Sequence, residues 1–439
     1  MTLNFTGYIE GYYGRLFDWR DRNRLVGGVA AAGMTSYFYA PKEDACHRQF
    51  WRQPYDKAWQ AEFTQFAATA ATKNIHLIAG IAPGLDFDFA SLDASMDQKH
   101  DFTILVAKTR QFLANGASMI ALLMDDIAAD FAARSGSFTN EGRAHAALAN
   151  RLGLAIDAPI IIVPRIYADS LITPDDMQSL TYLEQFTSHL DPQHQVVYCG
   201  DDIVAPRPFG DAGGHLDPAS IIIWDNFYAN DYCPRRLFLG PWRSTDMPHI
   251  MLNPTGMIET DLLLLELMAG ARNQAGRGSE AGKIYWRELM QKAAVPDVFF
   301  DIAAYFDTPY GFAAEFAMPS AKTALAALDI LLWRWKSPLQ REWYPHLMGL
   351  KQDSQLNRFI SMHAISFVLC NLVHLTNWII NGLPERFPRL KTLWIESGIA
   401  WLAFATQRLD NEYMMRSSEA PLLKRLPSEY IREMFFTTQ

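Results

Sequence analysis

The first two-thirds of the chain alternates short runs rich in β-branched and aromatic residues with longer helix-like stretches. This alternation predicts βαβ units, in which helices join parallel strands. The runs expected to form strands are residues 7–10, 36–40, 75–79, 119–124, 159–163, 196–199, 221–224 and 249–252. Because eight parallel strands close a (β/α)8 barrel of about 250 residues, the sequence predicts an α/β fold of the TIM-barrel type.

A different pattern begins after the last predicted strand. Residues 275–282 are rich in glycine and have the composition of a linker. Beyond them Trp, Leu, Ala and Met recur at helical spacing. We therefore expect a barrel over residues 1–275 and a mainly α-helical C-terminal domain over residues 283–439. The longest apolar stretch, 359–380, contains histidines and asparagines that lipid would hardly tolerate, so we interpret it as a buried bundle helix.

The composition argues against several classes of partner. The 439 residues carry a formal net charge of −9 and no Lys/Arg-rich run, which argues against nucleic acid and favours an uncharged ligand. The four cysteines are widely spaced and form no Cys/His cluster, so we expect no metal, no cofactor and no disulfide framework. The first residues do not have the pattern of a signal peptide, and we expect a cytoplasmic protein with no membrane segment.

Polar residues follow the ends of the predicted strands. In a barrel of this type the C-terminal ends of all the strands converge on one mouth. In strand order these residues are Gly11, Lys42, Asp86, Asp125, Asp126, Tyr167, Asp201, Asp202, Asn226, Asp231 and Asn253. Carboxylates, amides and a phenol are suitable hydrogen-bonding groups for sugar hydroxyls. The mouth is therefore expected to bind a carbohydrate.

Two adjacent carboxylates, Asp125 and Asp126, end the fourth predicted strand. Two unpaired carboxylates in a low-dielectric cleft cannot both ionise cheaply, so one tends to keep its proton near neutral pH, as a general acid requires. An Asp-Asp pair is also common at the start of a helix, where it caps the backbone. On the pair alone, both interpretations are open.

Several motifs at these strand ends resemble glycoside hydrolase family 84, the O-GlcNAcase family. They are GYIEGYYGR at 7–15, YAPKED at 39–44 followed by HR and WR, APGLD at 82–86, LMDDI at 123–127, WDNFYANDY at 224–232, LGP at 239–241 and LNP at 252–254. The resemblance covers roughly the first 255 residues. It implies a retaining exo-β-N-acetylglucosaminidase that uses the 2-acetamido oxygen of its substrate as the nucleophile.

The resemblance implies separate roles for the two acids. Asp125 would accept the acetamido N–H and orient the carbonyl oxygen towards C1 of the sugar. Asp126 would protonate the leaving oxygen and then, as a carboxylate, activate water. Because consecutive residues of a regular strand point to opposite sides, this division requires the chain to leave β geometry near Met124.

The remaining site residues would bind the sugar. Tyr167 would donate to the acetamido carbonyl, and Asn226 and Asp231 would bind hydroxyl groups. Residues 164–167 read PRIY where the family commonly has PTEY, so a different shape is expected for the loop after the fifth strand. The pocket would be completed by Lys42, Trp224, Asn253 and the backbone of Gly11. For Trp224 two roles stay open, that of a core residue and that of a platform on which a sugar packs.

The expected partner is a glycopeptide, glycoprotein or oligosaccharide that bears GlcNAc. The leading function is removal of terminal β-linked GlcNAc, including GlcNAc on serine or threonine. A hexosaminidase of chitin or hyaluronan fragments is a second function, which an extended groove would favour. A non-catalytic GlcNAc-binding protein is a third, although a lectin has no need of a general acid. The sequence also leaves open whether the protein forms a homodimer.

Overall fold

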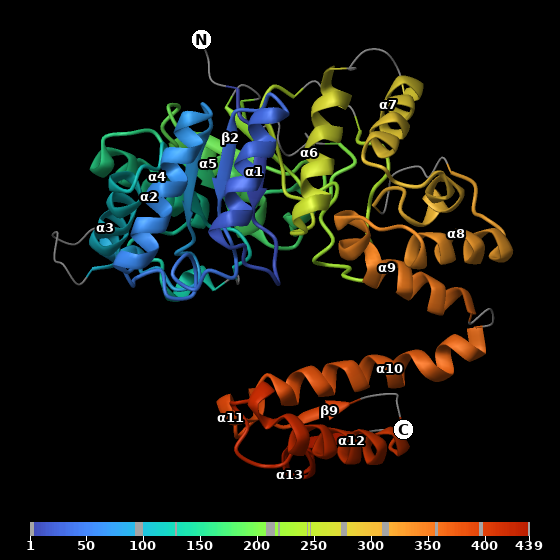
Figure 1. Cartoon of the computed structure of the whole chain (residues 1–439). Coiled ribbons are helices and arrows are strands. Elements are labelled where there is room, and N and C mark those ends of the chain that lie inside the picture. The colour runs from blue at the N-terminus through green and yellow to red at the C-terminus, as the bar shows by residue number, and fades with distance from the viewer. Residues whose placement is uncertain are drawn as a thin grey trace. The chain divides into compact units, whose positions relative to one another are not determined.

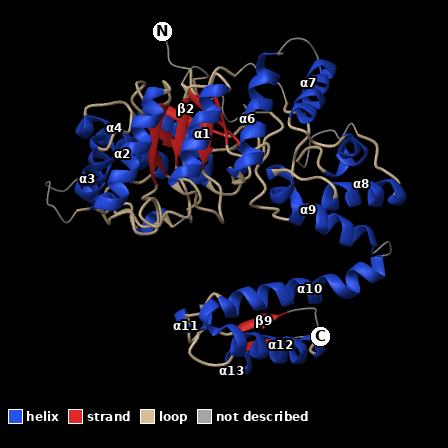
Figure 2. Cartoon of the chain, viewed as in Figure 1, coloured by secondary structure: helices blue, strands red, loops and turns tan. Residues whose placement is uncertain are grey.

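The computed structural model describes residues 4–92, 100–127, 130–207, 216–217, 220–243, 245, 247–273, 279–309, 316–355, 359–394 and 398–437. Eight parallel strands form a closed barrel in the order β1 to β8, with helices outside them (Figures 1 and 2). The strands are β1 (Thr6–Glu10), β2 (Ser36–Tyr39), β3 (His76–Ile81), β4 (Met119–Leu123), β5 (Ile161–Val163), β6 (Gln195–Tyr198), β7 (Ile221–Asp225) and β8 (Ile250–Leu252). The predicted TIM-type barrel is confirmed, and each predicted strand end lies within two residues of the observed one.

Helices alternate with these strands, and further helices follow the last strand. The α-helices up to residue 355 are α1 (Trp19–Ala31), α2 (Lys57–Thr72), α3 (Asp101–Ala114), α4 (Glu141–Ile156), α5 (Met177–His189), α6 (Ile258–Asn273), α7 (Ser279–Lys292), α8 (Ala321–Trp333) and α9 (Pro338–Gln355). The short 3-10 helices here are η1 (Phe89–Leu92), η2 (Phe131–Ala133), η3 (Asp169–Leu171) and η5 (Asp297–Tyr305). Side chains begin several of the helices: Asp18 caps α1, Asp56 caps α2 and Asn140 caps α4, each by accepting from a backbone N–H of the first turn.

The barrel interior is filled by alternate residues of the strands. Inward positions two residues apart, such as Ala121 and Leu123 of β4, are fully buried in one apolar cluster. Trp224 of β7 belongs to this cluster, and its ring lies 5.6 Å from that of Phe38 in an edge-on arrangement. The core therefore extends up to the end of β7, where the polar residues of the mouth begin.

A buried ion pair joins β1 to α1. Glu10 is fully buried, and its carboxylate accepts two hydrogen bonds from Arg22, at 2.9 Å from Nε and 2.8 Å from Nη2. The hydroxyl of Tyr37 donates to the same carboxylate over 2.7 Å. The guanidinium of Arg22 also lies 4.6 Å from the ring centroid of Trp19. The pair holds the first helix on the barrel.

The chain divides into two compact units, Met1–Met348 and Gly349–Gln439. The second unit contains α10 (Phe359–Ile380), α11 (Leu383–Arg386), α12 (Ala400–Arg416), η6 (Ser417–Glu419), α13 (Pro427–Met434) and a parallel pair of strands, β9 (Thr392–Trp394) and β10 (Phe435–Thr437). A mainly helical C-terminal region is thus confirmed. The expected domain bounds, 1–275 and 283–439, stay a prediction. Of the expected linker, 275–278 lies outside the described residues, and α7 already begins at Ser279.

The interpretation of 359–380 as a buried bundle helix is wrong for the side chains that the structure describes. The segment forms α10, but among its described side chains, 368–380, only Leu375 and Ile379 are buried, whereas Val373 is 59% exposed. The buried face packs in one apolar cluster with residues of α12 and α13. The sequence showed hydrophobicity on all sides, but the structure covers one side of the helix only. Among the described helices, none combines the length and apolarity needed to cross a membrane.

Candidate active site

A cavity of about 560 Å³ lies where the barrel strands end at their C-terminal side. All the site residues predicted from the sequence line it, namely Gly11, Lys42, Asp125, Asp126, Tyr167, Trp224, Asn226, Asp231 and Asn253. Of the other polar residues expected at the mouth, Asp202 lines the cavity. Asp86 instead accepts hydrogen bonds from Trp51 and Arg52, and Asp201 pairs with Arg207.

The two acids enter the cavity from the end of β4. Asp126 has a φ of 54°, in the left-handed region, so the chain leaves β geometry here, as the division of roles between the two side chains requires. Neither acid caps a described helix, because α4 begins at the cap Asn140 and η2 at Asp130. The helix-capping interpretation is therefore wrong for both residues.

Lys42 lies between the two carboxylates. Its Nζ donates to Asp125 Oδ2 and is 3.5 Å from Asp126 Oδ2, and the Lys42 side chain is 2% exposed. Burial opposes the ammonium charge, but the two carboxylates raise the pKa of Lys42 above its usual value. The pair is therefore not two unpaired acids sharing a proton, as the sequence had suggested. A buried cation supplied 83 residues away in sequence compensates their charge.

Two phenols also hold Asp126. The hydroxyl of Tyr13 donates to its Oδ2 over 2.8 Å, and the hydroxyl of Tyr167 donates to its Oδ1 over 2.7 Å. Burial favours a raised pKa for Asp126, but Lys42, these two hydrogen bonds and Arg48 outweigh it, and the pKa lies below its usual value. The hydroxyl of Tyr167, expected from the resemblance to meet an acetamido carbonyl, thus contacts the second acid in this structure.

Asp125 differs from its neighbour in having a free acceptor atom. Its side chain is 7% exposed against 32% for Asp126. Asp125 Oδ1 is buried, and no donor within the described part of the chain forms a hydrogen bond to it. A buried acceptor without a donor is costly, so this atom is suited to accept an N–H from a ligand in the cavity.

Hydrogen bonds among residues at the ends of β1, β7 and β8 build part of the cavity wall. Asn226 Oδ1 accepts from Trp224 Nε1 over 3.0 Å and from Asn253 Nδ2 over 2.9 Å. Asn253 Oδ1 in turn accepts from the backbone N–H of Gly11 over 3.2 Å. A Cβ atom on residue 11 would lie 2.2 Å from the Trp224 ring, so only glycine leaves room for the indole. Trp224 is both a core residue and part of the cavity wall.

The sequence reasoning missed two polar residues, Tyr13 and Tyr232, and an apolar wall. Tyr13 lines the cavity, and its backbone N–H donates to Asp231 Oδ2 over 3.1 Å. It lies within the motif at 7–15 but three residues beyond β1, so a rule that takes the first polar residue after each strand passes over it. The wall consists of Val163, Val197, Cys199, Ile203 and Val204. Alternation along β5 and β6 was the signal that could have revealed its strand residues.

The described residues include no group of three or more His, Cys, Asp or Glu side chains placed to hold a metal ion. The acidic and basic side chains that line the cavity are Asp125, Asp126, Asp202, Asp231 and Lys42, and they lie beside amides and phenols. A TIM-type barrel with carboxylates, amides and phenols at the C-terminal ends of its strands is typical of enzymes that act on sugars.

Comparison with known proteins gives the family. A model of the β-N-acetylglucosaminidase family matches residues 6–261, more than half of the chain. The protein therefore belongs to this family of glycoside hydrolases, glycoside hydrolase family 84. The resemblance seen in the sequence is confirmed.

Individual relatives agree with this assignment. The mouse and rat proteins named Protein O-GlcNAcase are each 29% identical over 275 residues, which is 60% of this chain and 29% of theirs. This chain thus matches less than a third of the length of these relatives. A solved structure titled "Structure of CpGH84B" matches with a TM-score of 0.63 at 17% identity, covering 98% of this chain and 76% of the other. At that identity the likeness concerns the fold alone.

Proposed function

We propose that this protein is a retaining exo-β-N-acetylglucosaminidase that removes terminal β-linked GlcNAc, including GlcNAc on serine and threonine of glycopeptides, by substrate assistance. The observation that carries the proposal is the unlike surroundings of two adjacent acids in one cavity. Asp125 is buried against Lys42 and has a free acceptor, whereas Asp126 is more exposed and held by two phenols.

In the first step Asp125 acts on the acetamido group. Its Oδ1 accepts the amide N–H, which turns the carbonyl oxygen towards C1 and stabilises the positive charge that grows as that oxygen attacks. The bond between C1 and the acetamido oxygen forms while the bond between C1 and the glycosidic oxygen breaks. The proton of Asp126 passes to the leaving oxygen, and an oxazoline remains after the amide proton is taken up by Asp125.

In the second step Asp126, now a carboxylate, takes a proton from water as that water attacks C1. The bond to the acetamido oxygen breaks, the amide recovers its proton, and GlcNAc leaves with its original configuration at C1. Asp126 is suited to this work because its side chain is 32% exposed, the more open of the two acids. A sugar in the cavity would remove that exposure and raise the pKa of Asp126, which favours protonation in the complex.

The size of the cavity supports removal of a single terminal sugar. Gly11, Trp224, Asn226 and Asn253 form one hydrogen-bonded part of its wall, and about 560 Å³ is in the range of pockets for small ligands. Tyr13 and Tyr232 line the cavity and are 45% and 54% exposed, so they are available to contact the aglycone. The names of the mouse and rat relatives, Protein O-GlcNAcase, support a protein-linked aglycone for this chain.

Hydrolysis of an aryl β-GlcNAc beside the matching aryl β-glucoside tests the proposal. The glucoside lacks the acetamido nucleophile, so we expect a preference for the GlcNAc substrate of at least about a hundredfold in kcat/KM. Comparable cleavage of both would remove the acetamido group from the mechanism. Cleavage of neither, with GlcNAc still bound, would favour the non-catalytic binding protein.

A further inference from the structure

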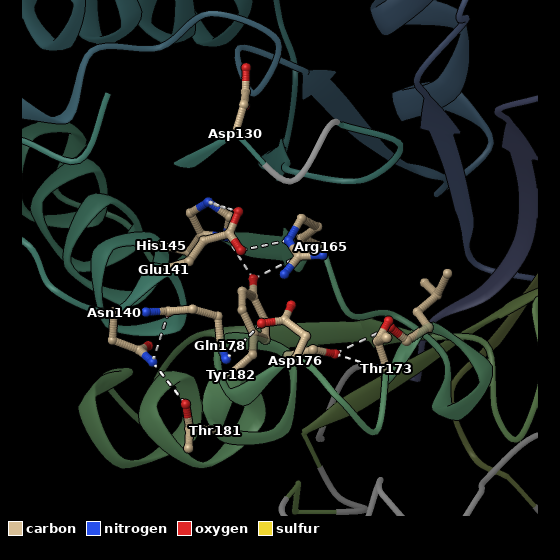
Figure 3. Close-up of polar contacts among 12 residues, drawn as sticks. Asp130, Asn140, Glu141, His145, Arg165, Thr173, Asp176, Gln178, Thr181 and Tyr182 are labelled. Atoms are coloured by element: carbon tan, nitrogen blue, oxygen red, sulfur yellow. Dashed lines mark hydrogen bonds and ion pairs between the residues drawn. The ribbon is translucent and has the colours of Figure 1, made fainter. Parts of the chain in front are cut away.

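Behind the loop that carries Tyr167 lies a buried polar cluster that does not line the cavity. Arg165, two residues before Tyr167, donates from Nε to Glu141 Oε2 over 2.6 Å (Figure 3). The side chain of Arg165 is 14% exposed and that of Glu141, at the start of α4, is 4% exposed. This ion pair therefore fixes the loop after β5 to the neighbouring helix. Position 165 is one of the two at which the chain departs from the PTEY sequence.

Two further residues complete the cluster. The backbone N–H of Arg165 donates to the hydroxyl of Tyr182 on α5 over 3.0 Å, and that hydroxyl lies 2.6 Å from His145 Nδ1. Burial raises the pKa of Tyr182, so the phenol keeps its proton, and burial lowers the pKa of His145 to about 3, so the imidazole is neutral. The hydrogen bond between Tyr182 and His145 Nδ1 therefore joins two neutral groups, and His145 Nε2 faces Glu141 at 4.0 Å (Figure 3).

The cluster and β6 together determine where Tyr167 lies. The carbonyl of Tyr167 accepts from the backbone N–H of Cys199 over 2.7 Å, which fixes one end of the short segment, and Arg165 fixes the other. Ile166 between them is fully buried. With its backbone held at both ends, Tyr167 presents its hydroxyl to Asp126 Oδ1 at 2.7 Å.

We propose that the Arg165–Glu141 ion pair is a positioning element for the reaction: it holds Tyr167 against Asp126. This inference rests on the proposed role of Asp126 as general acid. Loss of the pair allows the loop to move, and a small displacement of a group that contacts a catalytic residue is enough to lower kcat/KM roughly tenfold to a hundredfold.

The direction of the accompanying pH effect follows from the contact with Tyr167. A general acid must be protonated, so activity is lost as the pH rises through its pKa. The hydrogen bond from Tyr167 lowers the pKa of Asp126. Its loss therefore raises that pKa and moves the alkaline limb of the kcat profile, which reports the enzyme–substrate complex, to higher pH. Loss of folded protein alone would not produce this effect.

A double-mutant cycle tests the inference. The pH profile of kcat would be recorded at saturating substrate for wild type, Arg165→Met, Tyr167→Phe and the double variant, on an aryl β-GlcNAc with a poor leaving group. We expect Arg165→Met to move the alkaline limb in the same direction as Tyr167→Phe, and the double variant to move it no further than Tyr167→Phe. Arg165→Lys should restore most of the wild-type profile. Arg143→Met, on the exposed side of α4, is the matched control and should leave the profile unchanged.

Two results would overturn the inference: a loss of activity in Arg165→Met with no movement of the limb, or shifts that add in the double variant. If Arg165→Met fails to fold because Glu141 stays buried without its partner, Glu141→Gln combined with Arg165→Met removes the unpaired charge and enters the same cycle. Asp126→Ala separates this inference from the proposed function. If the limb persists without Asp126, the general-acid assignment fails; if it disappears and the cycle is additive, only the positioning role fails.

Discussion

Asp126→Ala is expected to lower kcat/KM by about 10²- to 10⁴-fold on aryl β-GlcNAc substrates with poor leaving groups and far less on those with good ones. A good leaving group departs without protonation, so it has little need of a general acid. Asp125→Ala is expected to cost about 10²- to 10³-fold on every substrate, because stabilisation of the acetamido group is required whatever the leaving group. A plot of log kcat/KM against leaving-group pKa for each variant measures the difference.

Asp202→Ala is the control for this experiment. Asp202 also lines the cavity, but its carboxylate accepts from the hydroxyl of Ser170 at 2.8 Å rather than facing Lys42, and we expect a change of no more than a few-fold. Equal leaving-group dependence in the Asp125 and Asp126 variants would contradict the division of roles. A steeper dependence for Asp125→Ala would reverse it.

Arg22→Met is expected to lower the free energy of unfolding of the barrel by about 3–5 kcal/mol. The substitution keeps an apolar side chain beside Trp19 but leaves the carboxylate of Glu10, which is fully buried, without its cation. Arg24→Met, on the same helix, is the matched control. Arg24 is 35% exposed and pairs with Glu259, which is 26% exposed, so its loss should cost no more than about 1 kcal/mol.

Denaturant unfolding followed by tryptophan fluorescence compares the two arginine variants. Because the chain forms two compact units, a transition in fluorescence is assigned to the barrel only if enzymatic activity is lost over the same range of denaturant concentration. Similar costs for Arg22→Met and Arg24→Met would show that burial of the Glu10 pair does not matter to the barrel.

The barrel could be predicted from the sequence because each strand is a short run of buried residues bounded by polar ones. Asp125, directly after Met119–Leu123, shows the same logic for the site, since strand ends meet at one mouth. The position of Lys42 between the acids could not be predicted this way. Its contact with Asp125 spans 83 residues of sequence and depends on how the side chain crosses the mouth. Because Lys42 lies between the acids, they are not the two unpaired carboxylates from which the sharing of a proton was predicted.

The helical region shows another limit of the sequence. In α10 the apolar residues run around the whole helix, and periodicity cannot tell which of them another element covers. Arg165 is a similar case. It lies where the sequence differs from the PTEY motif, and nothing in the sequence indicated that its ion-pair partner would be a buried glutamate on α4. The cytoplasmic location, the homodimer and the domain bounds stay predictions.

A series of aryl β-GlcNAc substrates with zero to three fluorines on the acetyl group tests the central claim most directly. Fluorine withdraws electrons from the carbonyl oxygen and weakens it as a nucleophile, so the account predicts a steady fall in kcat/KM with each fluorine. Binding of the matching N-fluoroacetyl glucosamines, measured in parallel, separates this effect from poor fit. Rates that do not depend on fluorine number, with binding unchanged, would contradict substrate-assisted catalysis in this protein.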